Sequence, residues 1–220
     1  MYLANCTRSD IAFATNLLAR FSSSPTQRHW NGIKHIFRYL RGTTNFGLFY
    51  FRGSKQEITG YADAGYLSDL HKVRSQTGYV FTCGGISISW RSQTLIVTSS
   101  NHAEVIALHE ASRECVWLRS VTQHIQETCG LPVNRDPIVL FEDNAACVAQ
   151  MKEGFIKSDR TKHIPPKFFS FSQELEKDKK INIQYIRSSD NVADLFTKAL
   201  PPTTFRKLIH DIGMRHKRDL

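Results

Sequence analysis

The chain has 220 residues, about one and a half average domains, so one domain with an appendage is expected. Hydrophobic residues make up 41% and charged residues 22% of the sequence, a globular composition that excludes a disordered, collagen-like or coiled-coil chain. The 29 Lys and Arg residues exceed the 20 Asp and Glu residues and give a formal charge of +9. This charge indicates either a nucleic-acid partner or a basic surface without one.

Cysteine spacing and hydropathy indicate the cellular compartment in which the protein is expected. The five cysteines include no Cys-x-x-Cys pair, which argues against a disulfide framework or a zinc ribbon and indicates free thiols in a reduced, intracellular compartment. No stretch approaches the ~20 apolar residues of a membrane span, so no membrane partner is expected. Arg8 and Asp10 interrupt the apolar start, which excludes a signal peptide and, with its abrupt beginning, indicates a piece of a longer protein.

Residues 9–40 have the apolar spacing of two amphipathic helices. Ser24 and Pro25 are expected as the N-cap and the first residue of the second helix, which should end at Gly42. Beyond residue 45 the apolar period changes to that of strands. Strands are expected at 46–51, 57–66, 78–83 and 86–90, with Gly84-Gly85 as a hairpin signal.

The second half of the chain alternates between helices and strands. The expected elements are a long helix at 101–127, a strand at 138–141, helices through Met151 and after Pro166, a strand at 181–185 and a final helix between Asp190 and Pro201. A strand meander followed by this alternation predicts an α/β fold with a mixed sheet covered by helices.

Acidic residues lie where the expected strands and helices meet, and two of them belong to or directly follow a strand. Asp63 lies inside an apolar strand, where a buried carboxylate needs a partner unless the side chain faces solvent. Asp143 ends the strand at 138–141, at the edge where open sheets bind ligands, but it is also suited to cap the next helix.

The other two acidic residues lie at the starts of helices. Glu104 belongs to the first turn of the long helix and is suited to a capping box with Asn101. Asp190 is the expected cap of the last helix, which leaves Asp194 for another role or for a solvated helix face.

Taken together, these acidic residues can converge on one edge of the sheet, where they repel each other unless protons or cations intervene. Carboxylate oxygens suit Mg²⁺, and two such ions about 4 Å apart clamp the attacking and leaving oxygens of a phosphodiester. A basic chain with a carboxylate cluster therefore indicates a metal-dependent nuclease.

At these residues the sequence resembles the ribonuclease H domain of copia-type LTR-retrotransposon Pol polyproteins. The matching runs are Gly60–Ala64, Ser75–Phe81, Ile88–Ser92, Ser99–Glu104, Glu142–Asn144, Thr161–Ile164 and Asn191–Lys198. Met1–Leu3 and Cys6–Ile11 resemble the end of the reverse transcriptase, which lies just upstream in such polyproteins.

The resemblance implies an RNase H-like five-stranded mixed sheet with flanking helices, preceded by a two-helix N-terminal segment. It divides the chain into a reverse-transcriptase remnant at 1–45, the RNase H-like domain at 46–200 and a basic C-terminal tail at 201–220. The implied partners are an RNA–DNA hybrid and the reverse transcriptase portion of the same polyprotein, in the cytoplasm, a virus-like particle or the nucleus.

The implied activity is hydrolysis of the RNA strand of the hybrid with two Mg²⁺ ions, or Mn²⁺ in their place. The resemblance assigns catalysis and metal binding to Asp63, Glu104, Asp143 and Asp194. Two other interpretations remain: a degenerate relic that binds nucleic acid or protein without cleaving, and a DNA strand-transfer enzyme of the same fold. The last is disfavoured because such enzymes usually end their acidic set in Glu, whereas this chain has Asp194.

The sequence departs from the pattern of the family at several places. Position 65 is Gly, where family members often carry a second Asp, and the loop at 187–190 lacks the His of cellular RNases H. His163 belongs to the pattern without an assigned role and is expected to be a packed structural residue. The connection from Trp90 to Ser99 is about two residues short, which should preserve the strand register but strain the start of the Glu104 helix and impair cleavage.

Overall fold

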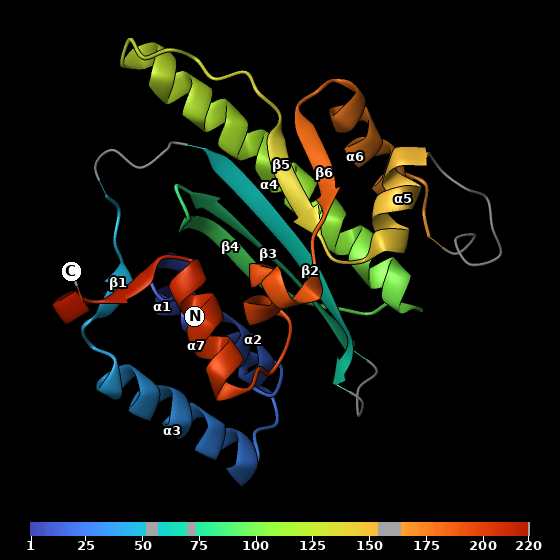
Figure 1. The fold of residues 1–220 in the computed structure, drawn as a ribbon. Coiled ribbons are helices and arrows are strands. Elements are labelled where there is room, and N and C mark those ends of the chain that lie inside the picture. Colours follow the sequence, from blue (N-terminus) through green and yellow to red (C-terminus); the bar gives the residue numbers. More distant parts are fainter. Residues whose placement is uncertain (52–56, 70–73, 154–163, 220) are drawn as a thin grey trace.

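The computed structural model describes residues 1–51, 57–69, 74–153 and 164–219. Its centre is a five-stranded sheet in the order β4-β3-β2-β5-β6 (Figure 1). β2 (Ile58–Asp69), β3 (Arg74–Cys83) and β4 (Ile86–Leu95) are antiparallel, and β5 (Ile138–Glu142) and β6 (Ile181–Tyr185) run parallel to β2. The expected α/β class and five-stranded mixed sheet are confirmed.

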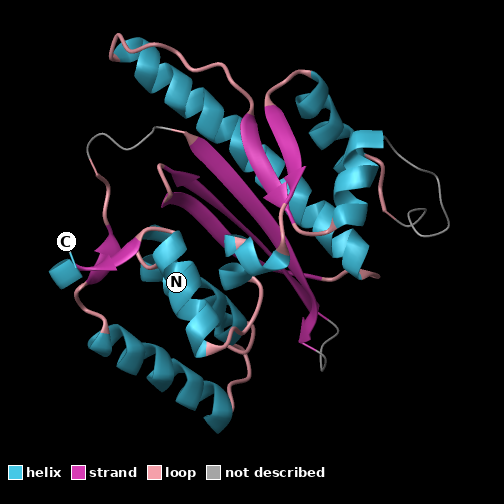
Figure 2. Cartoon of the chain, in the orientation of Figure 1, coloured by secondary structure: helices cyan, strands magenta, loops and turns pink. Residues whose placement is uncertain are grey.

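One face of the sheet is covered by α4 (Ser100–Thr128), α5 (Ala145–Glu153) and α6 (Lys167–Lys177), as Figure 2 shows. The long helix predicted at 101–127 is therefore present, and its apolar stripe is buried from Val105 to Leu118, whereas Ile125 is exposed. The core on this face joins Leu108 and Ala111 of α4 to Phe81, Leu140 and Ile183 of the sheet. Burial of such side chains is the main stabilising contribution to the fold.

The opposite face is covered by the two ends of the chain. The elements there are α1 (Tyr2–Cys6), α2 (Ala12–Ala19), α3 (Gln27–Gly42), the 3₁₀ helix η3 (Val192–Phe196) and α7 (Pro202–Asp211), with the short turns η1 (Ser9–Ile11), η2 (Ser188–Asp190) and η4 (Lys217–Asp219). A small sheet pairs β1 (Phe46–Leu48) with β7 (Met214–His216). The core on this face contains Val80, Phe196, Leu208 and Ile212. None of the helices described is long and apolar enough to cross a bilayer.

The N-terminal segment contains the expected helices, but the second begins later than predicted. Thr26 is the N-cap of α3 and forms a capping box with His29, whereas Ser24 and Pro25 lie before the helix. The reciprocal Thr26–His29 bonds satisfy backbone donors at the start of α3. A buried Arg8–Asp10 ion pair, at 2.7 Å, ties this segment together.

The hairpin of β3 and β4 forms at Gly84 and Gly85, whose φ values of 60° and 80° require glycine or a similarly permissive residue. A bulge between Phe81 and Thr82 interrupts the register, so Ile88 packs toward α4 while Trp90 packs on the other face. Beyond the bulge, Ser89–Leu95 pair with Ser75–Phe81 without a further shift, so the expected strand register is kept there.

The connection between β4 and α4 is shorter than expected. β4 stays paired with β3 as far as Leu95, so only residues 96–98 separate the strand from the N-cap Ser99. Ser99 has an extended backbone and accepts a hydrogen bond from the amide of His102 at 3.1 Å. The start of the helix is therefore regularly capped, and the structure does not support the expected strain at this position. Ser99, rather than Asn101, is the N-cap, so the Asn101–Glu104 capping box considered as an alternative does not form.

The C-terminal part differs most from expectation. The final helix predicted between Asp190 and Pro201 is only the 3₁₀ turn η3, capped by Asn191, whose side chain also donates to the carbonyl of Ala62 at 2.8 Å. The segment expected as a basic tail folds into α7 and β7, because Leu208, Ile209 and Ile212 bury an apolar stripe beneath its basic surface.

Glycines allow η3 and the residues after it to approach the sheet. A Cβ at Gly78 would lie 2.6 Å from Phe196 Cβ and 2.9 Å from Thr197 Cγ2. A Cβ at Gly65 would lie 2.6 Å from the carbonyl oxygen of Thr197, so a side chain such as the family's second Asp does not fit there. Gly78 is paired with Asp63 in the sheet, so this close contact lies directly beside the candidate site.

Substituting Gly78 with Ala should destabilise the protein by about 1–3 kcal/mol, because the added methyl group overpacks the contact with Phe196 and Thr197. Urea unfolding monitored by circular dichroism measures the change. Gly42→Ala is the matched control, since a Cβ there meets no atom within 4 Å. Equal stabilities of the two variants would contradict the proposed role of this contact.

Candidate active site

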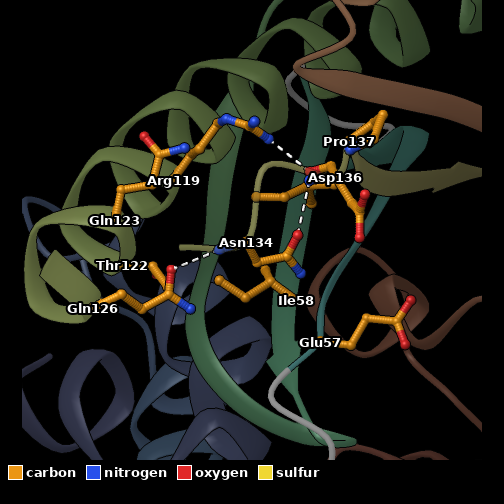
Figure 3. A pocket seen from close by; sticks show the side chains of 10 residues that line it. Glu57, Ile58, Arg119, Thr122, Gln123, Gln126, Asn134, Asp136 and Pro137 are labelled. Atoms are coloured by element: carbon orange, nitrogen blue, oxygen red, sulfur yellow. Dashed lines mark hydrogen bonds between the residues drawn. The ribbon is translucent and has the colours of Figure 1, made fainter. Parts of the chain in front are cut away.

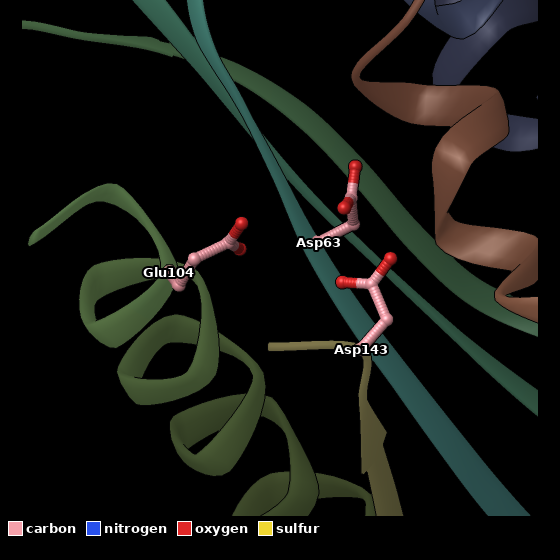
Figure 4. A group of neighbouring side chains, drawn as sticks. All are labelled: Asp63, Glu104 and Asp143. Carbon is pink, nitrogen blue, oxygen red and sulfur yellow. The ribbon is translucent and has the colours of Figure 1, made fainter. Parts of the chain in front are cut away.

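Three carboxylates converge at the point where β5 ends beside β2 (Figure 4). Asp63 comes from β2, Glu104 from α4 and Asp143 from the residue after β5, and each offers an oxygen within 4.8 Å of the others. Asp63 and Glu104 are buried, with exposed fractions of 0% and 8%. The expected convergence of these three residues on one sheet edge is therefore present.

The local structure explains why these side chains are available. Pairing of β5 with β2 ends at Glu142 and Ala62, which leaves the β5 edge of β2 unpaired beyond this point. Asn144 caps α5 by accepting from the amide of Cys147 at 3.1 Å. Asp143 is therefore not the cap of this helix, and its side chain remains free to face the cluster.

Asp194 lies beside this group and contacts Asp63 through a lysine. Its Oδ1 accepts from Lys198 Nζ at 2.7 Å, and the same ammonium donates to Asp63 Oδ1 at 3.1 Å. The hydroxyl of Thr197 donates to the other oxygen of Asp63. Asp194 is buried, which excludes the solvated helix face considered from the sequence.

Burial dominates the electrostatics of the cluster. Desolvation raises the pKa of Asp63 from 3.8 to about 6 although Lys198 opposes this change. Desolvation and the charges of Asp63 and Asp143 raise the pKa of Glu104 from 4.5 to about 9. Without a cation the cluster therefore retains protons near neutral pH, because like charges at short range resist joint ionisation.

Glu142 is a further member of the cluster that the sequence did not lead us to assign. Its side chain is fully buried on the α4 side of the sheet, and burial together with the charge of Glu104 raises its pKa well above the ordinary value. Its Oε1 accepts from the amide of Asn144 at 3.1 Å. The alternation Ile138, Leu140, Glu142 was the available signal, since residues two apart on a strand share a face.

The donor set fits a hard divalent cation. Glu104 Oε2 and Glu142 Oε2 are buried and have no hydrogen-bond partner within the described residues. Such oxygens are costly to leave uncompensated, and carboxylate oxygens are the ligands preferred by Mg²⁺ and Mn²⁺. The motif Thr161–His163 lies outside the described residues, so the expectation for His163 remains a prediction.

A hollow of about 430 Å³ lies at the other end of the sheet, where β2 and β5 begin (Figure 3). Arg119 donates there to the carbonyls of Asp136 and Arg135, both at 2.7 Å, and Gln126 accepts from the amide of Asn134 at 3.1 Å. These polar groups bond to one another and to the backbone. The hollow is therefore a structural feature remote from the carboxylates.

The raised pKa values predict how stability depends on pH without metal. Glu104 binds its proton more tightly in the folded than in the unfolded state, so its contribution is full below pH 4.5 and is lost as the pH rises through about 9. In EDTA the melting temperature should fall over this range, and millimolar Mg²⁺ should reverse the fall by favouring the ionised form.

Thermal unfolding of Glu104→Gln provides the control for this prediction. The amide cannot ionise, so the variant should lose less stability than the wild type as the pH rises. Identical pH profiles for the two proteins in EDTA would show that Glu104 does not carry the effect.

Curated relatives cover nearly the whole chain. It is 35% identical over 216 residues to the retrovirus-related Pol polyprotein from transposon TNT 1-94 of Nicotiana tabacum, which is 97% of this chain and 16% of that protein. It is 31% identical over 215 residues to the corresponding polyprotein from transposon RE1 of Arabidopsis thaliana, which is 97% of this chain and 14% of that protein. Secreted RxLR effector protein 161 of Plasmopara viticola is 41% identical over 120 residues, which are 54% of this chain and 84% of that protein.

Solved structures with partial similarity include the N-terminal RNase H domain of rv2228c from Mycobacterium tuberculosis. It is 15% identical, with a TM-score of 0.47, and the match covers 71% of this chain and 98% of that chain. RNase H1 from Halobacterium salinarum is 17% identical with a TM-score of 0.46, covering 64% of this chain and 94% of that chain.

A scan against protein-family models finds no match. The two Pol polyproteins nevertheless match 97% of this chain, and the chain spans only 16% and 14% of their lengths. The resemblance noted in the sequence is thereby confirmed: the chain belongs to the family of retrovirus-related Pol polyproteins of copia-type transposons and corresponds to one segment of them.

Proposed function

We propose that this chain is the ribonuclease H segment of its polyprotein and hydrolyses the RNA strand of RNA–DNA hybrids. The observation that carries the proposal is the convergence of Asp63, Glu104 and Asp143 at one sheet edge, with a buried carboxylate oxygen left uncompensated. A cluster of this kind is suited to divalent cations, and a basic chain is suited to a polyanionic substrate.

The acidic residues of the cluster are proposed to act as cation ligands. Asp63, Glu104, Asp143 and Asp194 would hold the divalent cations, Mg²⁺ or Mn²⁺. Asp63 lies within 4.8 Å of Glu104 and Asp143 and shares the Lys198 ammonium with Asp194. When bound, the cations supply activation of water and stabilisation of the charge that develops on the phosphodiester. Burial excludes bulk water from Asp63 and Glu104 and keeps their oxygens oriented toward the edge of the sheet.

Nucleic acid is proposed to bind along α3. This helix carries Arg28, Lys34, Arg38 and Arg41, which lie at the surface, and no acidic residue. Trp30 and Phe37 lie beside them with exposed fractions of 52% and 66%, and Lys34 Nζ lies 5.8 Å from the centre of the Trp30 ring. Cationic side chains interleaved with exposed aromatic rings suit phosphates and bases.

The competing proposal is a relic that binds nucleic acid without cleaving it. The retention of all four expected carboxylates favours the active enzyme, and a hybrid-cleavage assay in Mg²⁺ against EDTA separates the two. We further propose that residues 1–45 are the end of the reverse transcriptase, that 46–200 contain the nuclease and that 201–220 form a C-terminal extension. The five-stranded sheet begins and ends within 46–200, which supports this division.

The reverse transcriptase portion of the same polyprotein is the proposed protein partner. We also propose a reduced intracellular compartment, the cytoplasm, a virus-like particle or the nucleus. All five cysteines are free, and burial raises the pKa of the Cys115 and Cys147 thiols, which keeps them unreactive.

Substituting Asp63 with Asn should lower hybrid cleavage by about a hundredfold or more, because the variant loses the buried carboxylate at the centre of the proposed cation site. Hybrid affinity should be retained, since binding depends on cationic side chains. Cleavage of a labelled hybrid and its binding by fluorescence anisotropy measure the two effects. Asp178→Asn, at an exposed aspartate remote from the cluster, is the control, and undiminished cleavage by Asp63→Asn would remove Asp63 from the mechanism.

A triple variant in which Lys34, Arg38 and Arg41 are each replaced by Gln should bind hybrid more weakly and with a smaller salt dependence. The slope of log affinity against log salt should fall by about 1 for each cationic side chain that no longer neutralises a phosphate. Anisotropy titrations at several salt concentrations measure this slope. The control replaces Lys177, Lys179 and Lys180, which carry the same charge at the end of α6, and an equal loss of affinity in both variants would contradict a specific role of α3.

A further inference from the structure

The two sides of Asp63 differ in how their charge is compensated. On one side, Lys198 Nζ and the Thr197 hydroxyl donate to the two oxygens of Asp63. On the other side, Glu104 Oε2 is buried without a hydrogen-bond partner among the described residues. Among the described residues, the cluster therefore has a cationic side chain on the η3 side of Asp63 and none paired with Glu104 on the α4 side.

Lys198 bridges two carboxylates, as a divalent cation would. Its Nζ lies 2.7 Å from Asp194 Oδ1 and 3.1 Å from Asp63 Oδ1, distances typical of charge-assisted hydrogen bonds. The backbone amide of Lys198 also donates to the carbonyl of Asp194 at 3.1 Å, so one turn of chain supplies both the acid and its counter-charge. Both contacts are ion pairs, so the Lys198 ammonium occupies the position between Asp63 and Asp194.

We propose that Lys198 is a built-in counter-cation: the free protein binds one divalent ion, at Asp63, Glu104 and Asp143, and accepts a second ion beside Asp194 only when Lys198 withdraws. The inference rests on the proposed function and deepens it, because it makes the number of bound ions a property of this side chain. Lys198 acts here as a positioning residue that holds Asp63 and Asp194 together without metal.

Competition follows from the shared ligands. A cation beside Asp194 needs the oxygens that Lys198 already engages, and two positive charges at this distance repel each other. The Lys198 side chain is 35% exposed, in contrast to the fully buried Asp63. Its flexible four-carbon stem allows the ammonium to move into solvent while η3 and Thr197 keep their positions.

Binding of Mn²⁺ without nucleic acid, measured from the electron paramagnetic resonance signal of the free ion, tests the proposal. We expect the wild type to bind one ion per chain. Lys198→Met should bind a second ion at least about tenfold more tightly than the wild type does, because its competitor is gone. Lys207→Met is the matched control: it removes an exposed lysine paired with Asp190 at 3.2 Å, and one bound ion is expected.

Two ions of similar affinity in the wild type, or the same Mn²⁺ isotherm for Lys198→Met and the wild type, would overturn the proposal. If the wild type still cleaves hybrids, the proposed function stands. A wild type that neither binds Mn²⁺ nor cleaves would contradict the proposed function itself.

Loss of the ammonium leaves Asp63 poorly compensated, so Lys198→Met is expected to melt at a lower temperature in EDTA and to recover this loss in Mn²⁺. Circular dichroism melts measure both. If the variant does not fold in EDTA, the ion count of the wild type decides the question alone, because two tightly bound ions contradict a resident ammonium. A Lys198→Met melting temperature in EDTA equal to that of the wild type would also count against the proposal.

Discussion

The Asp63 carboxylate lies in the middle strand of the sheet with no exposed surface, and a buried charge of this kind must be compensated. The compensating groups, the Thr197 hydroxyl and the Lys198 ammonium, come from the residues that follow η3. This segment reaches Asp63 because Gly65 and Gly78 leave room for its backbone and side chains. Compensation of one buried charge thus determines where η3 packs and, through it, where Asp194 lies.

The rest of the acidic cluster follows from the connections of the sheet. β5 stops pairing with β2 at Ala62 and Glu142, so the next residue, Asp143, and the beginning of α4 meet the open edge of β2. Glu104 and Glu142 approach from the α4 side, whereas Asp63 and Asp194 belong to the η3 side. Carboxylates from both faces therefore meet at one edge of the sheet. A divalent cation is most strongly favoured beside those carboxylates that have no cationic side chain as a partner.

The sequence predicted those helices, strands and turns whose patterns are contained within short segments. The apolar stripe of α4, the strand alternation and the Gly84-Gly85 turn are properties of short segments. The position of Asp63 inside a strand, and those of Glu104 and Asp143 at the ends of such segments, predicted their convergence on one sheet edge, which the structure contains. The pairing of β1 with β7 joins residues that are far apart in the chain, so no short window contains it.

The C-terminal helix and the lysine bridge depend on signals that are weaker in the sequence. Pro202 followed by Leu208, Ile209 and Ile212 is a helical pattern that the basic charge of the segment obscures. Asp194 and Lys198 have the i, i+4 spacing of an ion pair, but only the packing of η3 on Gly78 shows that the pair reaches Asp63.

The central claim is that a divalent cation occupies the edge of the sheet where β5 ends beside β2. The most direct measurement is anomalous X-ray scattering from crystals of the full chain soaked in Mn²⁺. We predict an anomalous peak among the carboxylates of Asp63, Glu104 and Asp143. Strong Mn²⁺ peaks elsewhere on the protein with none among these three side chains would contradict the claim.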